Sequence, residues 1–273
     1  MRRHIVGYVV LCCVLSVISS AQCPVNESQA EAARHRAYPN GSWNGPGPSV
    51  LDVLNAMGIA PTKENLLAAL NCQDPEIRSL AAGELTHQKV KEAIPELERL
   101  LDASEPLWKV DLAVDLALLG DPRGVQVLQG FCDDSSLDMM DRLHAADRLA
   151  GDLKQKSCPK LLVEAMNAKE FEYRSYALSS IPHMKELSPA EAAQLRALAE
   201  KSLFDEDSVV RMQAASTIQF IADVQAIPAL QTAIARETDD FAKSEMIWAL
   251  KSLEERQQNS PSSAESASGN TSH

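Results

Sequence analysis

A basic residue recurs six times along this chain of 273 residues at almost the same interval. Successive copies lie 31, 33, 32, 37 and 32 residues apart. Each copy has an acid four positions before it, a small or apolar pair three and four positions after it, and an aliphatic residue at the seventh position. The acids and bases are Asp74 and Arg78, Glu105 and Lys109, Asp138 and Arg142, Glu170 and Arg174, Asp207 and Arg211, and Asp239 and Lys243. Such a period predicts helical hairpins stacked as an all-α solenoid.

Each repeat is expected to form two helices joined by a turn. The first helix carries apolar residues at helical spacing, as at Ile94, Leu97 and Leu101. The acid then stands where the second helix begins, and Asp74 followed by Pro75 is typical of a helix start. The small pair after the base lets the second helix lie close to its neighbours. We therefore predict about six hairpins over residues 62–256.

Two hairpins open with the same motif, Ala93-Ile-Pro-Glu-Leu97 and Ala226-Ile-Pro-Ala-Leu230. Together with the ladder of acids and bases, this motif closely resembles the short HEAT-like repeat that is also found in phycobilin lyases. The resemblance covers about residues 62–256 and implies a right-handed α-solenoid, in which the ladder is structural and crosslinks neighbouring hairpins. Tetratricopeptide repeats have a similar period, but their Gly-Tyr signature is missing here.

The N-terminus has the three parts of an export signal. Arg2 and Arg3 precede an apolar run of 14 residues, and the small residues Ser19-Ser20-Ala21 follow. A membrane anchor is the alternative, but it needs about 20 apolar residues. We predict a signal peptide over residues 1–21 and a mature protein that is periplasmic or secreted, without membrane insertion.

The segments that flank the repeats differ in composition. Residues 22–61 mix two short helical stretches with a Pro/Gly-rich loop, and are expected to cap the first hairpin. Residues 257–273 are rich in serine and are expected to form a disordered tail. After signal cleavage the chain has 24 basic and 38 acidic residues, a net charge of −14, which disfavours nucleic acid and anionic lipid as partners.

Four cysteines remain after cleavage, an even number in an oxidising compartment. They allow three patterns of pairing. A bond between Cys23 and Cys72 is expected to hold the cap against the repeats, whereas Cys132 and Cys158 are expected at opposite ends of adjacent helices. No two cysteines stand in a C-x-x-C pair, so the spacing does not indicate zinc.

The sequence contains no catalytic motif. It has no H-E-x-x-H, G-x-S-x-G, P-loop or G-x-G-x-x-G pattern. The resemblance suggests two enzyme classes as alternatives, the bilin lyases and the iron-dependent deoxyhypusine hydroxylases, but the His-Glu pairs of the latter are missing. We therefore expect no enzyme activity, no cofactor and no metal.

The second helices of such a solenoid line its concave wall, where a partner would bind. Positions two and six after each base are expected to face outward on this wall. Arg148 and Tyr176 belong to the residue types that most often anchor a partner, and Asp111 and Asp115 suggest a basic patch on that partner. The predicted role is that of a scaffold or adaptor for a protein or peptide, bound through Glu84, Asp111, Asp115, His144, Arg148, Tyr176, Gln213 and Glu245.

Overall fold

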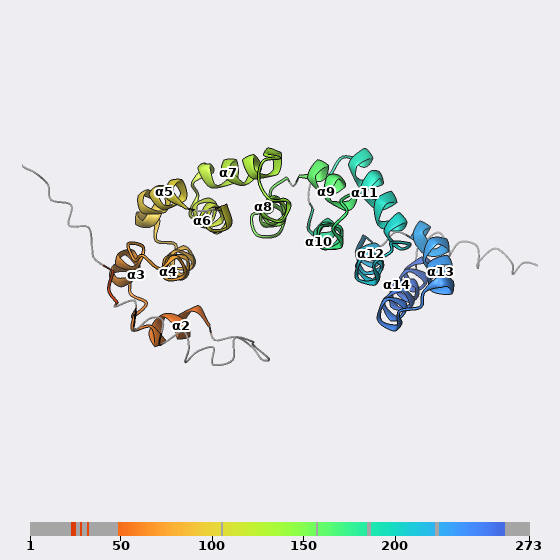
Figure 1. Ribbon diagram of the computed structural model, residues 1–273, viewed down its shortest axis with the longest axis horizontal. Helices are drawn as coiled ribbons and strands as arrows, with labels where there is room; N and C mark the ends of the chain where they lie inside the picture. The colour runs from red at the N-terminus through yellow and green to blue at the C-terminus, as the bar shows by residue number, and fades with distance from the viewer. Residues whose placement is uncertain are drawn as a thin grey trace, which may run out of the picture. The chain divides into compact units, whose positions relative to one another are not determined.

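The computed structural model describes residues 23–25, 28, 32, 49–104, 106–156, 158–184, 187–221 and 224–259. Every regular element in these ranges is a helix, and the helices follow one another as hairpins, so the predicted all-α solenoid is confirmed (Figure 1). The chain divides into two compact units, residues 1–85 and 86–273. The predicted signal peptide and most of the predicted tail lie outside the described residues.

The first unit holds part of the cap and the first hairpin. Its helices are α2 (Val50–Ala56), α3 (Lys63–Ala69) and α4 (Pro75–His87), the last two residues of which belong to the second unit. Helix α2 is the second of the two helical stretches expected in the cap. It begins with a capping box, in which Ser49 and Asp52 bind each other's backbone N–H groups.

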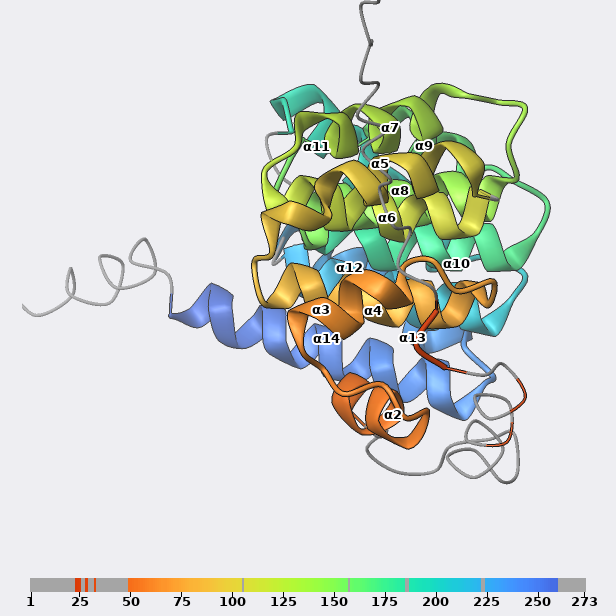
Figure 2. The ribbon, with the colours of Figure 1, turned by 90° about the vertical axis from the view of Figure 1, so that its left-hand side faces the viewer.

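The second unit contains five more hairpins in two layers. The first helices form one layer and the second helices form the other, as both views show within this unit (Figures 1 and 2). The first helices are α5 (Ile94–Ala103), α7 (Pro122–Asp133), α9 (Pro159–Met166), α11 (Pro189–Ser202) and α13 (Ile227–Arg236). The second helices are α6 (Pro106–Leu119), α8 (Met139–Gly151), α10 (Phe171–Ser180), α12 (Ser208–Ile221) and α14 (Asp240–Gln258).

Small residues allow the two layers to approach closely. The alanine pairs of α8 and α12 are buried. Gly124 of α7 lies against α6, where an added Cβ atom would stand 2.1 Å from the carbonyl oxygen of Ala113. No side chain fits at this position unless the two helices move apart.

The acids of the ladder begin the second helices. Asp74, Asp138, Asp207 and Asp239 each accept a hydrogen bond from a backbone N–H two residues further on. This is the geometry of a helix N-cap. Glu170 stands at the same place before α10, and Glu105 lies outside the described residues. The acids therefore act on their own helix, and they do not make the crosslink between hairpins that was expected from the ladder.

The arginines make that crosslink. Arg174 donates to the carbonyl oxygens of Ala168 and Lys169, in the turn after the first helix of its hairpin, at 3.0 and 2.5 Å. Its other nitrogens form two bonds to Asp205 of the next hairpin, at 2.9 and 2.8 Å. Arg174 thus holds the turn inside its own hairpin and connects it to the next hairpin.

Arg211 and Arg142 repeat this arrangement. Arg211 binds the carboxylate of Glu237 at 2.6 and 2.7 Å, and this contact lowers the pKa of Glu237 to about 2. Arg142 binds Glu164 of α9 through two bonds of 3.0 Å and also donates to the carbonyl of Cys132. Lys109 and Lys243 are the bases of the first and the last hairpin of the second unit, and both are half-buried.

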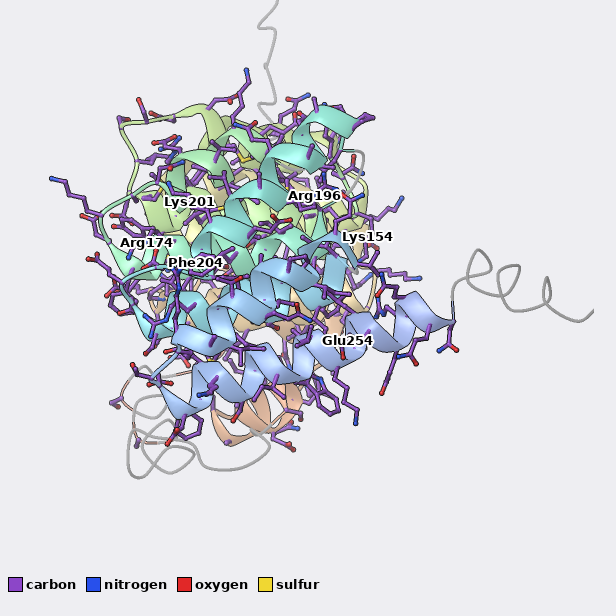
Figure 3. The ribbon with its side chains drawn as sticks, turned by 90° about the vertical axis from the view of Figure 1, so that its right-hand side faces the viewer. Lys154, Arg174, Arg196, Lys201, Phe204 and Glu254 are labelled. Carbon is purple, nitrogen blue, oxygen red and sulfur yellow. A yellow bond between two sulfur atoms is a disulfide. The ribbon has the colours of Figure 1, made fainter. Side chains whose placement is uncertain are left out.

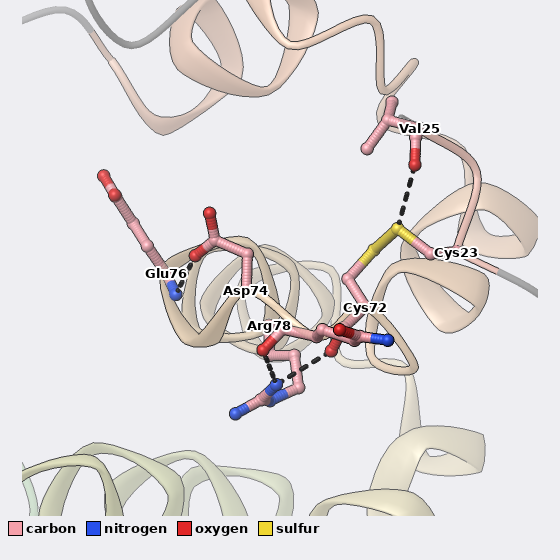
Figure 4. The surroundings of a disulfide bond; sticks show 7 residues. Cys23, Val25, Cys72, Asp74, Glu76 and Arg78 are labelled. Atoms are coloured by element: carbon pink, nitrogen blue, oxygen red, sulfur yellow. Dashed lines mark hydrogen bonds between the residues drawn. A yellow bond between two sulfur atoms is a disulfide. The ribbon is translucent and has the colours of Figure 1, made fainter. Parts of the chain in front are cut away.

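Two disulfide bonds join the four described cysteines. Cys23 is bonded to Cys72, as predicted, beside the carbonyl groups that Arg78 holds (Figure 4). Cys132 is bonded to Cys158, which shows that their expected separation was wrong. The reason is the length of α9, whose eight residues span about 12 Å. Glu164 near its end contacts Arg142 beside Cys132, so Cys158 at its start is close as well.

Removing the second disulfide should destabilise the protein. For the variant with Cys132→Ser and Cys158→Ser we expect a loss of about 3 kcal/mol in the free energy of unfolding, because the bond closes a long loop in the unfolded chain. The two cysteines are 26 residues apart. Urea unfolding without reductant measures this loss. An unchanged midpoint would show that the bond does not constrain the unfolded chain.

The described helices were also compared with what a bilayer requires. None of them combines the length and the apolar character needed to cross a membrane.

Candidate binding surface

The residues predicted to bind a partner lie on the second helices, and six of the eight are accessible. Position two after each base is half-buried and reaches the surface of this layer, at Asp111, His144, Tyr176, Gln213 and Glu245. Position six is mostly buried, as at Asp115 and Thr217. The hydroxyl of Thr217 donates to the carbonyl oxygen of Leu178 at 2.8 Å. Position six therefore faces the preceding second helix and not a partner.

This burial corrects two predicted binding residues. Asp115 is 9% exposed in the second unit, and Glu84 is 7% exposed in the first. Burial raises the pKa of Asp115 to about 7, although the hydroxyl of Thr86 lowers it in part. Neither carboxyl group is available to a partner at the surface.

Arg148 is the exception at position six, and it connects two helices. It donates to Asp111 of α6 at 2.9 Å and to Asp152 after α8 at 2.7 Å. The charge of Asp111 is therefore matched inside the protein. The sequence predicted an acidic patch for a basic partner, but the structure has an arginine between two carboxylates instead. The three side chains are partly exposed.

An aromatic pair lies on the neighbouring helices. The rings of His144 on α8 and Tyr176 on α10 have centroids 5.2 Å apart and are tilted by 57°. Burial raises the pKa of Tyr176 to about 12, with a further contribution from Asp147. The phenol therefore keeps its proton and remains a hydrogen-bond donor at neutral pH. Asp147 in turn contacts the ring nitrogen Nδ1 of His183 at 3.2 Å.

The sequence interpretation did not include the aromatic residue Phe220 of this layer. Phe220 of α12 is 69% exposed. It stands seven residues after Gln213, so both side chains lie on the same face of the helix. The signal in the sequence is an aromatic residue nine positions after the base, where the motif itself places no restriction.

We use the name inner surface for seven side chains of the second helices in the second unit, namely the accessible residues at the predicted binding positions together with Phe220. Arg148 and Asp111 are in contact there, as are His144 and Tyr176, whereas Gln213 and Glu245 lie further along on α12 and α14. The inner surface consists of Asp111, His144, Arg148, Tyr176, Gln213, Phe220 and Glu245.

Pockets also occur beside the arginine crosslinks. One of about 480 Å³ is lined by the second disulfide, Arg142 and Lys156. Another, of about 840 Å³, is lined by Arg174, Lys201 and Phe204, which lie close together in Figure 3. Both pockets mix charges of opposite sign, which does not indicate one class of ligand. The described residues contain no group of three His, Cys, Asp or Glu side chains arranged to hold a metal ion.

The chain was compared with known proteins. Its sequence matches HEAT repeats over residues 64–150 and 159–251. No curated protein matches it.

Among solved structures, an engineered protein is similar with a TM-score of 0.47 and 21% identity, covering 88% of this chain and 66% of the other, just under two thirds. A second engineered protein has a TM-score of 0.40 and 19% identity, covering 88% and 94%. Human deoxyhypusine hydroxylase in complex with glycerol has a TM-score of 0.36 and 15% identity, covering 84% and 98%.

The two segments that match HEAT repeats carry all six hairpins of the structure. Together they make up more than half of the sequence. The chain belongs to the HEAT-repeat family.

Proposed function

We propose that this protein is an exported HEAT-repeat adaptor that binds a protein or peptide on its inner surface. The observation that carries this proposal is a group of side chains on neighbouring helices: Arg148 with its two carboxylates, and His144 of the same helix paired with Tyr176 of the next. Arginine and tyrosine are enriched among the residues that contribute most to protein interfaces. Exposed Phe220 extends the group with an apolar contact.

The proposed role is binding and not catalysis, because the ionisable groups of this surface are engaged with each other. Arg148 is held by Asp111 and Asp152, and His183 by Asp147. Such pairs orient side chains for recognition. A partner that offers both a carboxylate and a basic group can exchange for these contacts, so we expect its affinity to fall as the salt concentration rises.

Export is part of the proposal. The N-terminal sequence has the form of a signal peptide. The two disulfides support the same compartment, since such bonds persist in oxidising environments and are rare in the cytosol.

A capture experiment tests the proposal. Tagged residues 22–273 are incubated with the envelope fraction of the native host, and the retained proteins are identified by mass spectrometry. The variant with Arg148→Ala and Tyr176→Ala should bind the captured partner at least about a hundredfold more weakly, because two anchors of about 2 kcal/mol each are lost.

Arg123→Ala is the matched control. Arg123 lies on α7 in the other layer and, like Arg148, bridges two partly exposed carboxylates, those of Glu98 and Asp102. We expect full binding from this variant. If the double variant binds as well as the control does, the partner does not use the inner surface.

A further inference from the structure

The last hairpin exposes a face that is buried in the hairpins before it. The residue four positions after the base is covered in the preceding second helices of this unit, and Ala113, Ala146, Leu178 and Ala215 are at most 1% exposed. In α14 this position is Ile247, which is 50% exposed. The residue after it, Trp248, is 60% exposed, whereas its counterparts are buried at Val114 and half-buried at Asp147, Ser179 and Ser216.

The first helix of this hairpin also leaves accessible a position that is buried in an earlier hairpin. The shared Ala-Ile-Pro motif aligns Ile234 of α13 with Leu101 of α5. Leu101 is 2% exposed, but Ile234 is only half-buried. Figure 3 shows this end of the unit, with α13 and α14 nearest the viewer and no described helix covering them. The face therefore has the composition of an interface between hairpins, and no hairpin of the described residues lies against it.

The residues that follow α14 in the sequence do not suit this face. Beyond Asn259 the sequence is dominated by serine, and its most apolar side chains are one proline and two alanines. Such a segment has too little apolar surface to offset the entropy of ordering it over Ile247 and Trp248.

The exposed stripe of α14 fits a reversed copy of itself. Along the helix it reads Phe241, Ser244, Trp248 and Lys251, all of them exposed. If two α14 helices meet in opposite directions with Trp248 against Ser244 of the second copy, then Lys251 lies against Phe241 of the second copy. Each large ring thus meets a small side chain or a flexible cation. Indole against serine is a good fit in volume, and a lysine ammonium on a phenylalanine ring is favourable.

Charge also allows this contact. The whole chain is acidic, with a formal net charge of −12. Helix α14 is nearly neutral, since it carries four acids and three bases among its 19 residues. Repulsion between two copies is therefore smaller at this helix than elsewhere on the protein.

We propose that a second copy of this chain covers the exposed face of the last hairpin, giving a dimer with two-fold symmetry through α14. The dimer is closed, because the same patch is used by both copies. It uses none of Arg148, His144 and Tyr176, which carry the adaptor proposal, although Glu245 of α14 lies beside the contact, and its test needs no binding partner.

The test is the mass of purified residues 22–273 in solution, measured by sedimentation velocity or by light scattering over a range of micromolar concentrations. The wild-type protein should have twice the mass of one chain at the upper end. Trp248→Glu should raise the dissociation constant at least about thirtyfold, as expected for a buried aromatic anchor. Trp248 is exposed within one chain, so the variant should keep the helical content of the wild-type protein, as measured by circular dichroism.

Leu118→Glu is the matched control. Leu118 of α6 is an apolar side chain with similar exposure, 54%, on another second helix. This variant should dimerise like the wild type. A wild-type protein that stays monomeric throughout the range, or a Trp248→Glu variant that remains dimeric, would overturn the proposal.

Discussion

Replacing Arg174 with alanine should lower the free energy of unfolding by about 3–5 kcal/mol, the loss typical of a buried ion pair with one partner removed. The side chain of Arg174 is 8% exposed and that of Asp205 is 14% exposed. The substitution removes the two hydrogen bonds that Arg174 donates to the Asp205 carboxylate and leaves it only the one from the backbone N–H of Asp207. It also frees two carbonyl groups at the turn after α9.

Arg99→Ala provides the comparison. Arg99 also forms an ion pair, with Glu96 on the same helix, but its side chain is 56% exposed. Exposed pairs of this kind contribute about 0.5 kcal/mol. Urea unfolding of both variants should therefore give very different losses. Equal small losses would mean that the crosslink between hairpins adds little to stability.

Asp115 should make the protein less stable as the pH rises from about 4 to about 7. In the folded protein the pKa of this carboxyl is raised from 3.8 to about 7. The folded state therefore binds a proton more tightly than the unfolded chain does, and stability is lost as that proton dissociates. The difference between the two pKa values corresponds to about 4 kcal/mol at most.

Asp115→Asn isolates this contribution. Asparagine is neutral and nearly isosteric with aspartic acid. In this variant, residue 115 should therefore contribute equally to the free energy of unfolding at pH 5 and at pH 8. At pH 8 it should be more stable than the wild type, by up to about 4 kcal/mol. Asp133→Asn removes an exposed acid of α7 and should leave the wild-type pH dependence intact. If the free energy of unfolding changes with pH in Asp115→Asn as it does in the wild type, the raised pKa does not belong to Asp115.

The architecture of this protein is predictable from its sequence because the repeat is strict. Acids, bases and small residues recur at fixed positions, and each is needed for local reasons. Asp207 caps a helix, Arg211 binds the carbonyl groups of the turn before it, and the small or apolar residues Ala214 and Ala215 are fully buried. These requirements are the same in every hairpin, so the sequence repeats them.

The partners of the arginines were harder to predict. An acid four residues before a base suggests a pair on one helix face, but Asp207 precedes its helix and caps it. The acids that bind Arg174 and Arg211 are Asp205 and Glu237, each two residues before the next ladder acid. This second acid is present in the sequence, but it is missing from the earlier repeats, where Glu164 takes its place for Arg142.

The binding surface was predicted in part for a related reason. Periodicity places positions two and six on one side of a helix, and it gives no information on the neighbouring second helix. Contact between α10 and α12 buries Thr217, and burial likewise removes Asp115 from the surface. The pairing of Arg148 with Asp111 joins residues 37 positions apart. Such a contact depends on the curvature of the stack and not on a local pattern.

The central claim, that the inner surface binds a protein partner, is tested most directly by hydroxyl-radical footprinting with the captured partner. Oxidation of Tyr176, His144 and Phe220 is measured with and without it. The account predicts that these three side chains are protected in the complex, while Phe204 beside the arginine crosslinks is oxidised at its original rate. Protection of Phe204 with unchanged oxidation of Tyr176, His144 and Phe220 would contradict the claim.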